Sequence, residues 1–246
     1  RGEKPVAALP DELWQETIAR LPFLAHLDTE EMARLRALTE AFLAEKEFTS
    51  AGGLELTDAM CVSIAAQGCL PILNLGLSCY RDWVGIIVYP DEFVIPRTQE
   101  DEFGIVHEYD EVASGEAWEG GPLLISWNDA QMAGDGYNVV IHEFAHKLDM
   151  LNGAVDGTPP LADGASYRDW AKIFSREYLR LRDNLKKGRR TFLDEYAAVD
   201  EAEFFAVATE QFFSQPLLMK KHAPELYHIL GQYYRQDPAS RTLQKG

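Results

Sequence analysis

The segment His142-Glu143-Phe144-Ala145-His146 lies inside an apolar stretch that predicts one helix over 138–151, with Asn152-Gly153 as its C-terminal stop. Residues four apart share one face of a helix, so His142 and His146 project side by side. Two neutral imidazoles at this spacing can share one tetrahedral zinc ion. Glu143 lies beside the pair, where it can take a proton from water without being a ligand itself.

The residues around this motif make chance occurrence a poor explanation. The flanking side chains are mainly valine, isoleucine, leucine and phenylalanine, and the whole chain contains only 6 histidines. Burying two histidines and a glutamate in such a helix costs free energy unless they have partners. A metal ion would be such a partner. The motif therefore predicts one bound Zn²⁺ and the chemistry of a zinc-dependent peptidase.

A catalytic zinc ion needs a third protein ligand and one open position. The helix continues with Lys147-Leu148-Asp149-Met150, so no third histidine follows directly. Residues 200–210 offer Glu203 and Glu210, which are seven apart and so lie roughly on one face of a helix. With Asp200 as the helix cap, Glu203 also falls where a capping carboxylate belongs. The residues alone leave Glu203 and Glu210 as equal candidates.

Asp149 follows His146 by three residues and has two possible roles. Its carboxylate can orient the imidazole of a metal ligand from behind, as carboxylates commonly do at metal sites. It can equally contact the loop expected beyond the helix, at 153–165. The spacing does not separate these two interpretations.

The rest of the chain alternates helical and extended patterns. Amphipathic periodicity and capping residues predict helices that begin near residues 11, 28, 57, 167, 200 and 224. Short apolar runs predict strands at 84–89, 92–96 and 122–127, and an acidic segment at 99–119 separates the last two. We expect the last of these strands to pair with an extended substrate, as edge strands do.

This order predicts an α+β fold with a zincin-like metallopeptidase core, built from a small sheet and the active-site helix, with a helical N-terminal portion and C-terminal helices. We interpret residues 1–246 as a single compact unit. Within it, residues 1–80 form the mainly helical N-terminal portion and residues 81–246 the zincin-like catalytic core.

Charge and cysteine content restrict the partners and the compartment. The formal net charge is −17, which disfavours direct binding of nucleic acid and would attract a basic protein. The three cysteines, Cys61, Cys69 and Cys79, form no Cys-x-x-Cys pair, which favours reduced thiols in a cytoplasmic protein. We see no signal peptide and no run of eighteen apolar residues, so no membrane span is expected.

Several separated motifs resemble the Mlc titration factor A family. The residues His142 to Asp149 are followed by Glu195-Tyr196-Ala197-Ala198 and by Ala202 to Val207, all matching the family in order. Residues 104–107 and 114–118 match it as well. The resemblance covers most of the chain from about residue 71 to residue 238. It is specific because the motifs are separated and keep their order.

The resemblance implies a bacterial cytoplasmic zinc metallopeptidase with aminopeptidase activity, whose catalytic core is similar to that of anthrax lethal factor. It also implies binding and inactivation of the repressor Mlc, with an effect on glucose-uptake regulation. By this resemblance Glu203 is the third zinc ligand and Glu143 is the general base. The alternative is a latent or non-catalytic protein that sequesters the repressor and uses zinc for structure or regulation.

Two further residues gain roles through the resemblance. Tyr196 lies seven residues before Glu203, as the active-site tyrosine of lethal factor does before its ligand glutamate, so its phenol could donate to the oxyanion. Otherwise it is a core tyrosine. His107 matches a position that the family associates with zinc, and as a fourth ligand it would close the site. Otherwise it is a surface histidine.

Overall fold

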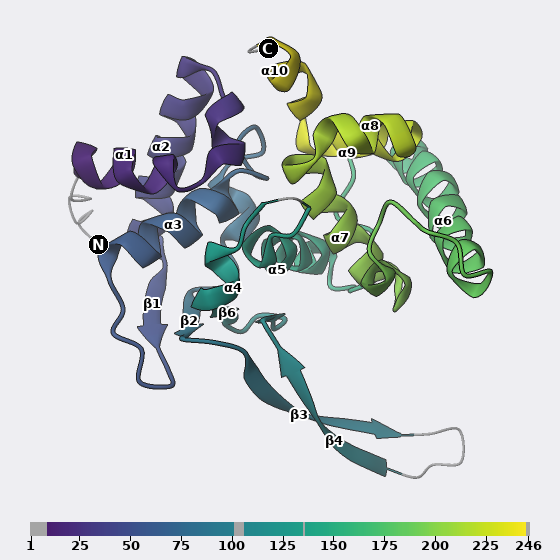
Figure 1. Ribbon diagram of the computed structural model, residues 1–246, viewed down its shortest axis with the longest axis horizontal. Coiled ribbons are helices and arrows are strands. Elements are labelled where there is room, and N and C mark those ends of the chain that lie inside the picture. The colour runs from purple at the N-terminus through teal and green to yellow at the C-terminus, as the bar shows by residue number, and fades with distance from the viewer. Residues whose placement is uncertain (1–8, 101–105, 135, 245–246) are drawn as a thin grey trace.

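The computed structural model describes residues 9–100, 106–134 and 136–244. Within these ranges it describes the side chains except those of residues 97–100, 106–109, 165 and 242–244. The chain is an α+β protein in which a small sheet is surrounded by helices (Figure 1).

The main sheet has four strands in the order β1-β2-β6-β5. The strands β1 (Glu47–Ser50), β2 (Gly85–Tyr89) and β6 (Leu123–Ser126) are parallel. The short strand β5 (Gly115–Ala117) pairs antiparallel with β6 and forms the outer edge. Every residue of β6 is buried, as expected for an inner strand covered on both faces.

Helix α5 (Val139–Asp149) carries the HEFAH motif, and all of its residues are buried. The side chain of Asn138 caps it by accepting a hydrogen bond of 2.9 Å from the backbone N–H of Ile141. Helix α7 (Glu201–Ser214) packs against α5, and Asp200 caps it in the same way. Because both caps are fixed by side chains, the facing residues of the two helices are held in a defined register.

The remaining helices enclose this pair on both sides (Figure 1). The N-terminal group is α1 (Asp11–Ala19), α2 (Thr29–Glu45) and α3 (Asp58–Cys69). The C-terminal group is α6 (Gly164–Lys186), α8 (Pro216–His222), α9 (Pro224–Tyr234) and α10 (Pro238–Gln244). Short helices complete the described chain: η1 (Pro22–His26), η2 (Leu77–Tyr80), α4 (Trp127–Gln131), η3 (Met150–Asn152) and η4 (Glu195–Ala198).

An aromatic cluster joins the N-terminal helices to the motif helix. The ring of Phe144, from the centre of the motif, lies 5.6 Å from Phe42, 5.2 Å from Tyr80 and 5.7 Å from Trp83 between ring centroids. Rings at these separations stabilise one another beyond their buried area. The side of α5 that faces away from the histidines is therefore fixed by the core, and one hydrophobic cluster takes residues from both the 1–80 and the 81–246 portions.

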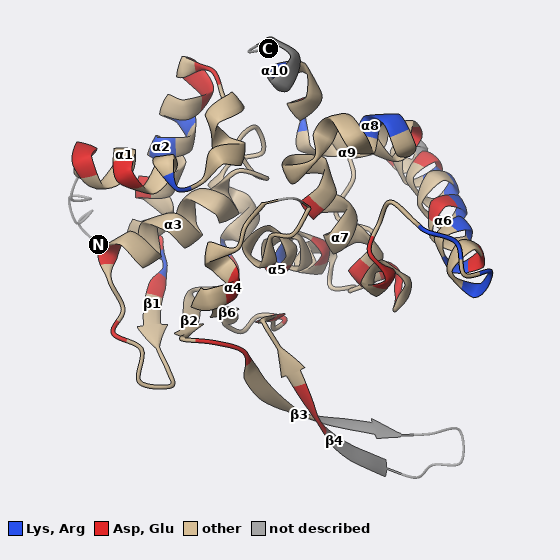
Figure 2. Cartoon of the chain, viewed as in Figure 1, with Lys and Arg blue, Asp and Glu red and all other residues tan. Residues whose placement is uncertain are grey.

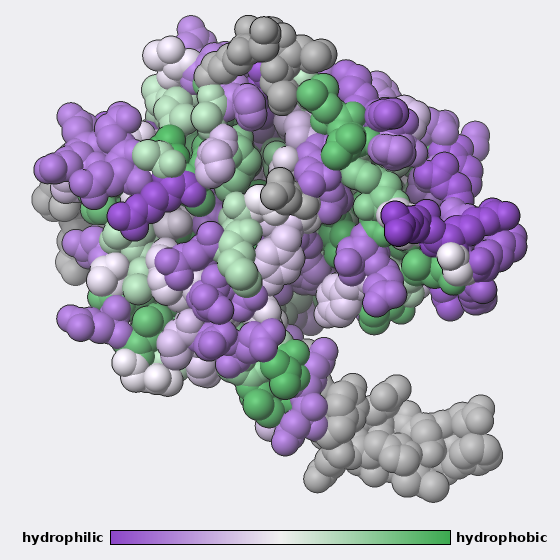
Figure 3. Space-filling view, in the orientation of Figure 1, coloured by the Kyte–Doolittle hydropathy of each residue, from purple (hydrophilic) through white to green (hydrophobic). Residues whose placement is uncertain are grey.

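The structure corrects the extended part of the prediction. The sequence did not predict β1, and the segment 99–119 is not a spacer. It contains β4 (Val106–Ala113), which forms an antiparallel hairpin with β3 (Phe93–Glu100). The hairpin projects from the body (Figures 1 and 3). At its base, Phe93 and Ile95 form a small second buried core with Leu124 of β6.

The expectation that residues 122–127 form a substrate-pairing edge strand is wrong. Strand β6 lies between β2 and β5, so both of its edges are already hydrogen-bonded. The outer edge belongs to β5, whose three residues are too few and too polar to stand out as a strand in the sequence. An extended peptide could pair only with β5 on this side of the sheet.

The three cysteines are free. Cys69 is completely buried, and burial raises the pKa of its thiol. Among the described residues, no helix is both long and apolar enough to cross a membrane.

We predict that Gly68→Ala destabilises the protein by about 1–3 kcal/mol of unfolding free energy. A Cβ at this buried position in α3 would lie 2.3 Å from the ring of Phe144, which cannot move without disturbing the aromatic cluster. Chemical denaturation monitored by circular dichroism measures the effect. Gly164→Ala, at the exposed start of α6 with only a flexible arginine near by, is the matched control and should change stability little.

Candidate metal centre

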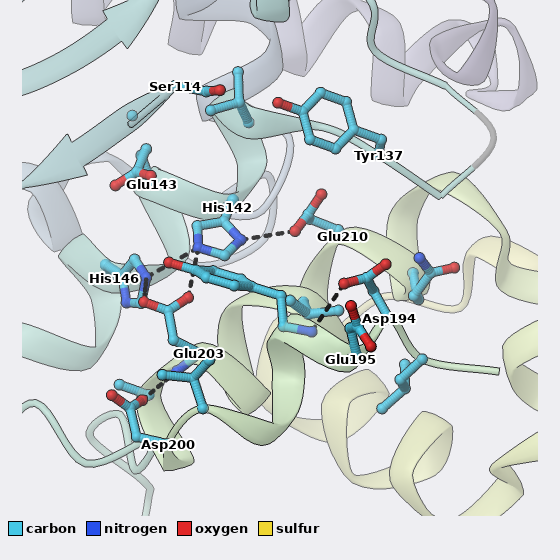
Figure 4. Close-up of a pocket in the computed structure, with 18 of the residues that line it drawn as sticks. Ser114, Tyr137, His142, Glu143, His146, Asp194, Glu195, Asp200, Glu203 and Glu210 are labelled. Atoms are coloured by element: carbon cyan, nitrogen blue, oxygen red, sulfur yellow. Dashed lines mark hydrogen bonds and ion pairs between the residues drawn. The ribbon is translucent and has the colours of Figure 1, made fainter. Parts of the chain in front are cut away.

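Three side chains from two helices converge on one point (Figure 4). His142 and His146 project from α5, and Glu203 projects from the first turn of α7. One nitrogen from each imidazole and one carboxylate oxygen lie within 4.8 Å of one another. The structure therefore brings together the two histidines of the motif and one of the two carboxylates that the spacing left open.

The distances match what a tetrahedral metal ion requires. The Nε2 atoms of His142 and His146 lie 3.1 Å apart, and Glu203 Oε2 lies 2.9 Å from His142 Nε2. Glu203 Oε1 lies 3.5 Å from His146 Nε2. Two ligands bonded at about 2.0–2.1 Å in tetrahedral geometry stand roughly 3.3 Å apart. Two imidazoles and a carboxylate so arranged fit a divalent metal ion.

Glu210 lies on the opposite side of the His142 ring from Glu203. Its Oε1 is 2.7 Å from His142 Nδ1, and its Oε2 accepts a 2.7 Å hydrogen bond from the backbone N–H of Asn138. A carboxylate at Nδ1 holds the proton there and leaves Nε2 free to bind a metal. The geometry thus separates the two candidates: Glu203 faces the point where the ligands converge, and Glu210 orients His142.

The charges around His142 create a strong preference for a cation. Burial lowers the pKa of His142, but its hydrogen bonds to Glu203 and Glu210 outweigh burial, so the pKa lies well above the ordinary value. Burial raises the pKa of Glu203, but hydrogen bonds from His142 and His146 bring it well below its usual range. A metal ion and a proton would compete for the same Nε2 atom, so metal affinity should rise with pH.

Glu143 is buried beside the two histidines, directly beneath the edge strand. Burial raises its pKa to about 7, although the histidines lower it and the carboxylates of Glu203 and Glu116 add to the rise. A carboxylate with such a pKa can both accept and return a proton near neutral pH. A Cβ at Gly115 of β5 would lie 2.5 Å from Glu143, so only glycine leaves room for this approach.

A cleft of about 1190 Å³ opens over the three converging side chains. One wall is formed by β4 and β5, including Glu111 and Glu116, and the opposite wall is formed by the end of α6 and the segment that leads into α7. Tyr137 and Ser114 line one end (Figure 4). The residues of β5, the outer strand of the sheet, thus line the same space as the converging histidines.

The residue that follows the motif holds the β5 wall of the cleft in place. The Nζ atom of Lys147, the residue after His146, donates hydrogen bonds of 2.6 Å to Trp118 O and 2.9 Å to Gly121 O. These carbonyls belong to the turn between β5 and β6. Burial lowers the pKa of Lys147 to about 8. A single buried lysine therefore ties the motif helix to the edge strand.

Asp149 contacts the loop beyond the helix. Its Oδ2 accepts a 2.8 Å hydrogen bond from the backbone N–H of Gly157, and the side chain is completely buried. Burial raises the pKa of Asp149 to about 6. Of the two roles that the spacing allowed, the structure shows the loop contact.

Tyr196 lies in η4 on the cleft wall, with 46% of its surface exposed. Its ring centroid is 6.1 Å from that of His142. Partial burial, together with the carboxylates of Glu203, Glu111 and Glu143, raises the pKa of its phenol, so the hydroxyl keeps its proton. His107 lies in β4, where its backbone is paired opposite Gln99 of β3, and its side chain is outside the described part of the structure.

Comparison with known proteins agrees with this geometry. Residues 3–235 match the family described as glucose-regulated metallo-peptidase M90. The chain is 40% identical over 238 residues to Mlc titration factor A of Salmonella arizonae, covering 94% of this chain and 93% of that protein. It is 38% identical over 231 residues to an uncharacterized protein of Synechocystis sp., covering 92% of this chain and 84% of that protein.

Mlc titration factor A of Salmonella typhi is 40% identical over 235 residues, covering 93% of this chain and 87% of that protein. An α+β fold with a buried His-Glu-x-x-His helix and a carboxylate facing both histidines defines a metallopeptidase class of site. The chain belongs to the glucose-regulated metallopeptidase family M90, the family of Mlc titration factor A. The resemblance that the sequence motifs indicated is thereby confirmed.

Two features of the site had no separate signal in the sequence. Glu210 was visible as a candidate ligand, but its place at Nδ1 of His142 depends on how α7 packs against α5. The role of Lys147 depends on the position of a turn some 30 residues earlier in the chain. A lysine inside an otherwise buried helix was the only available hint, because an ammonium group there needs acceptors.

We predict that Glu210→Gln lowers affinity for a divalent metal by roughly 10- to 100-fold. The amide can accept at one of its two contacts, but at the other its NH₂ group would face a donor, either His142 Nδ1–H or the N–H of Asn138. Competition with a chromogenic chelator measures the affinity. Glu201→Gln, on the exposed first turn of the same helix, should leave it unchanged. An unaltered affinity in Glu210→Gln would show that the carboxylate does not orient the histidine.

Proposed function

We propose that this protein is a zinc-dependent metallopeptidase that removes residues from the N-terminus of peptides, and that its core is zincin-like. One observation carries the proposal. His142, His146 and Glu203 converge on one point, and the buried carboxylate of Glu143 lies beside that point beneath an antiparallel edge strand. This combination supplies metal ligands, a base and a surface for an extended peptide.

Zinc is the metal that this ligand set fits. Two imidazole nitrogens and one carboxylate oxygen suit a borderline-soft divalent ion that accepts four ligands, with one position left for substrate. We assign His142, His146 and Glu203 as the ligands. A zinc ion held there supplies Lewis acidity toward the scissile carbonyl and toward water.

Glu143 moves the proton. Its carboxylate takes a proton from the water that attacks the scissile carbonyl, and it passes the proton to the leaving amine when the C–N bond breaks. The raised pKa of Glu143 suits both transfers, because neither the loss nor the gain of the proton is then strongly uphill near neutral pH. Burial keeps the carboxylate away from bulk water, and Gly115 leaves room for Glu143 beneath the edge strand.

Strand β5 positions the substrate. Its outer edge faces the cleft, and an extended peptide that pairs with it would pass over Glu143 and the converging histidines. Acidic residues on this wall, Glu111 and Glu116, favour a substrate with a positively charged amino end. This charge pattern supports cleavage next to a free N-terminus.

We further propose that Tyr196 donates a hydrogen bond to the oxygen that becomes negatively charged during attack. Its place on the cleft wall beside His142 and the raised pKa of its phenol support this role, because the hydroxyl must carry a proton to donate. A role for His107 as a fourth ligand stays a prediction.

Glu143→Gln should abolish hydrolysis of alanine 4-nitroanilide by the zinc-loaded protein and leave zinc content unchanged. The amide is isosteric with the carboxylate but cannot accept the proton. Absorbance of released nitroaniline and metal analysis measure the two quantities. Glu201→Gln makes the same chemical change at the exposed first residue of α7, outside the cleft lining, and is the matched control that should keep full activity. Hydrolysis that survives Glu143→Gln would contradict the role of Glu143 as the proton acceptor.

Tyr196→Phe should lower kcat roughly 100-fold and change KM little, because the lost hydrogen bond forms only as negative charge develops. Steady-state hydrolysis of the same anilide gives both constants. Tyr89→Phe makes the same chemical change on β2, outside the cleft lining, and should leave both constants as they are. An equal kcat in Tyr196→Phe and the unaltered protein would remove the tyrosine from the mechanism.

We also propose that the protein binds an Mlc-type repressor. The support comes from the relatives named Mlc titration factor A, which match nearly the whole chain at 40% identity. Binding and hydrolysis can coexist in one protein. If the zinc-loaded protein binds the repressor and hydrolyses no peptide, it is instead a sequestering protein whose zinc is structural or regulatory.

Pull-down of purified Mlc repressor should succeed equally well with the unaltered protein and with Glu143→Gln. Glu143 is only 5% exposed, so an isosteric amide leaves the outer surface unchanged. Loss of binding in Glu143→Gln, with the fold intact by circular dichroism, would mean that binding and catalysis share the site. No binding by either protein contradicts the repressor proposal.

A further inference from the structure

Positive charge is concentrated on one segment of this acidic chain. Nine of the 23 lysines and arginines lie between residues 168 and 190, where there are only three acidic residues, although the whole chain has a formal net charge of −17. These residues are distributed along α6 and along the loop after its C-terminal end (Figure 2). Most of them face solvent or pair with neighbouring carboxylates, as Arg176 and Lys187 do.

Two of these cations differ from the others because they line the cleft that contains the candidate metal centre. Arg189 and Arg190 are the only arginine or lysine side chains in the described lining of that cleft. The same lining contains eight carboxylates: Glu111, Glu116, Glu143, Asp194, Glu195, Asp200, Glu203 and Glu210. A substrate carboxylate would therefore meet attraction at one place in the cleft and repulsion at most others.

Within the described part of the chain neither guanidinium forms a direct ion pair with a carboxylate. The hydrogen bond from Lys187 lowers the pKa of Asp183, and the charge of Arg189 near by contributes to that lowering. Arg189 Nη1 lies 3.3 Å from the amide oxygen of Asn184, which is uncharged. Both arginines are exposed. A guanidinium without an acidic partner keeps its donors available for a bidentate contact with an incoming carboxylate.

The backbone that carries the two arginines is fixed on both sides. Helix α6 ends in a Schellman motif: Gly188 takes a φ of +65°, its N–H donates to Leu185 O at 2.9 Å, and the N–H of Arg189 donates to Asn184 O at 3.0 Å. Beyond the arginines, the ring of Phe192 stacks on His222 with 5.3 Å between centroids. Because both ends are anchored, the loop presents the guanidinium groups to the cleft without first having to be ordered.

Helix electrostatics alone does not explain this pair. Cations near the C-terminus of a helix are favoured by the helix dipole, and Lys186 in the last turn of α6 and Lys187 at its C-cap already supply them. Arg189 and Arg190 follow the glycine that ends the helix, on the side that faces the cleft. Their position fits a ligand in the cleft better than it fits the helix end.

We propose that Arg189 and Arg190 form a carboxylate subsite that selects peptides with a negative charge downstream of the cleaved bond, either the C-terminal carboxylate of a short peptide or an acidic side chain. The proposal rests on the proposed function. A peptidase that acts at the N-terminus places only one residue before the scissile bond. The remainder of the cleft, including these arginines, must then receive the chain on the carboxyl side of that bond.

The subsite gives the cleft a polarity that matches a short peptide. Carboxylates on β4 and β5 favour the ammonium group at one end of the substrate, and the two guanidinium groups favour the carboxylate at the other end. A peptide bound in the reverse direction would place each charge beside a like charge. The charges therefore set the direction of binding as well as its strength.

The test compares two probes that differ by one charge, tetra-alanine and tetra-alanine amide. Calorimetry with the zinc-loaded Glu143→Gln protein measures binding without turnover. We expect roughly tenfold tighter binding of the free carboxylate at low salt, and a smaller ratio as salt is raised. In the same background, Arg189→Ala/Arg190→Ala should bring the ratio close to one, and Arg189→Glu/Arg190→Glu should make the amide the better ligand.

Lys186→Ala/Lys187→Ala is the matched control, because it removes two positive charges from the same helix end but from outside the cleft lining. This variant should keep the tenfold ratio. Equal loss of the ratio in the lysine and arginine variants would show a general field effect and overturn the subsite. A ratio of one in the parent protein would overturn it as well.

Hydrolysis of alanine 4-nitroanilide by the protein with Glu143 intact reports separately on the proposed function, because this substrate carries no carboxylate. Hydrolysis with no charge-dependent peptide binding would leave the peptidase standing and reject the subsite. A charge-dependent ratio that needs Arg189 and Arg190, without hydrolysis, would support a carboxylate-binding cleft and reject the peptidase.

Discussion

The structure depends on the contact between α5 and α7, where buried histidines meet carboxylates. Burying His142 in an apolar helix costs free energy unless its ring nitrogens have partners, and α7 supplies Glu203 on one side and Glu210 on the other. Glu210 also accepts from the N–H of Asn138, the residue that caps α5. One carboxylate therefore fixes the start of the motif helix, the orientation of a histidine and the packing of the two helices. Removing this carboxylate would leave His142 Nδ1 and the backbone N–H of Asn138 without their hydrogen-bond partner.

The other walls of the cleft are held by comparable single contacts. Lys147 ties the motif helix to the turn behind β5, and Phe144 anchors the opposite side of the same helix in the aromatic cluster. Gly115 lets the edge strand lie directly over Glu143. The five-residue motif thus contributes to two different parts of the molecule: its histidines and Glu143 face the site, and its phenylalanine faces the core. This division explains why a short stretch of sequence is so informative about the fold.

Local pattern was sufficient for the seven longest helices of the described chain, because capping residues and apolar periodicity act within a few residues, but it did not predict the short helices α4, α8 and α10. Asn138 and Asp200 mark the starts of α5 and α7 as expected. Pattern was insufficient for β1, β4 and β5, whose residues are mostly polar and form strands only by pairing with other segments of the chain. It was also insufficient to separate Glu203 from Glu210, because both lie on the inner side of one helix and only the distance to each nitrogen of His142 distinguishes them. The family resemblance selected Glu203, and the geometry agrees.

The central claim is that His142, His146 and Glu203 hold one zinc ion. Anomalous diffraction at the zinc edge from crystals of the zinc-loaded protein tests it most directly, because it gives both the element and its ligands. We expect a single zinc peak bonded to the Nε2 atoms of both histidines and to a carboxylate oxygen of Glu203, at about 2.0–2.2 Å. Zinc bound elsewhere, or a ligand set in which Glu210 replaces Glu203, would contradict it.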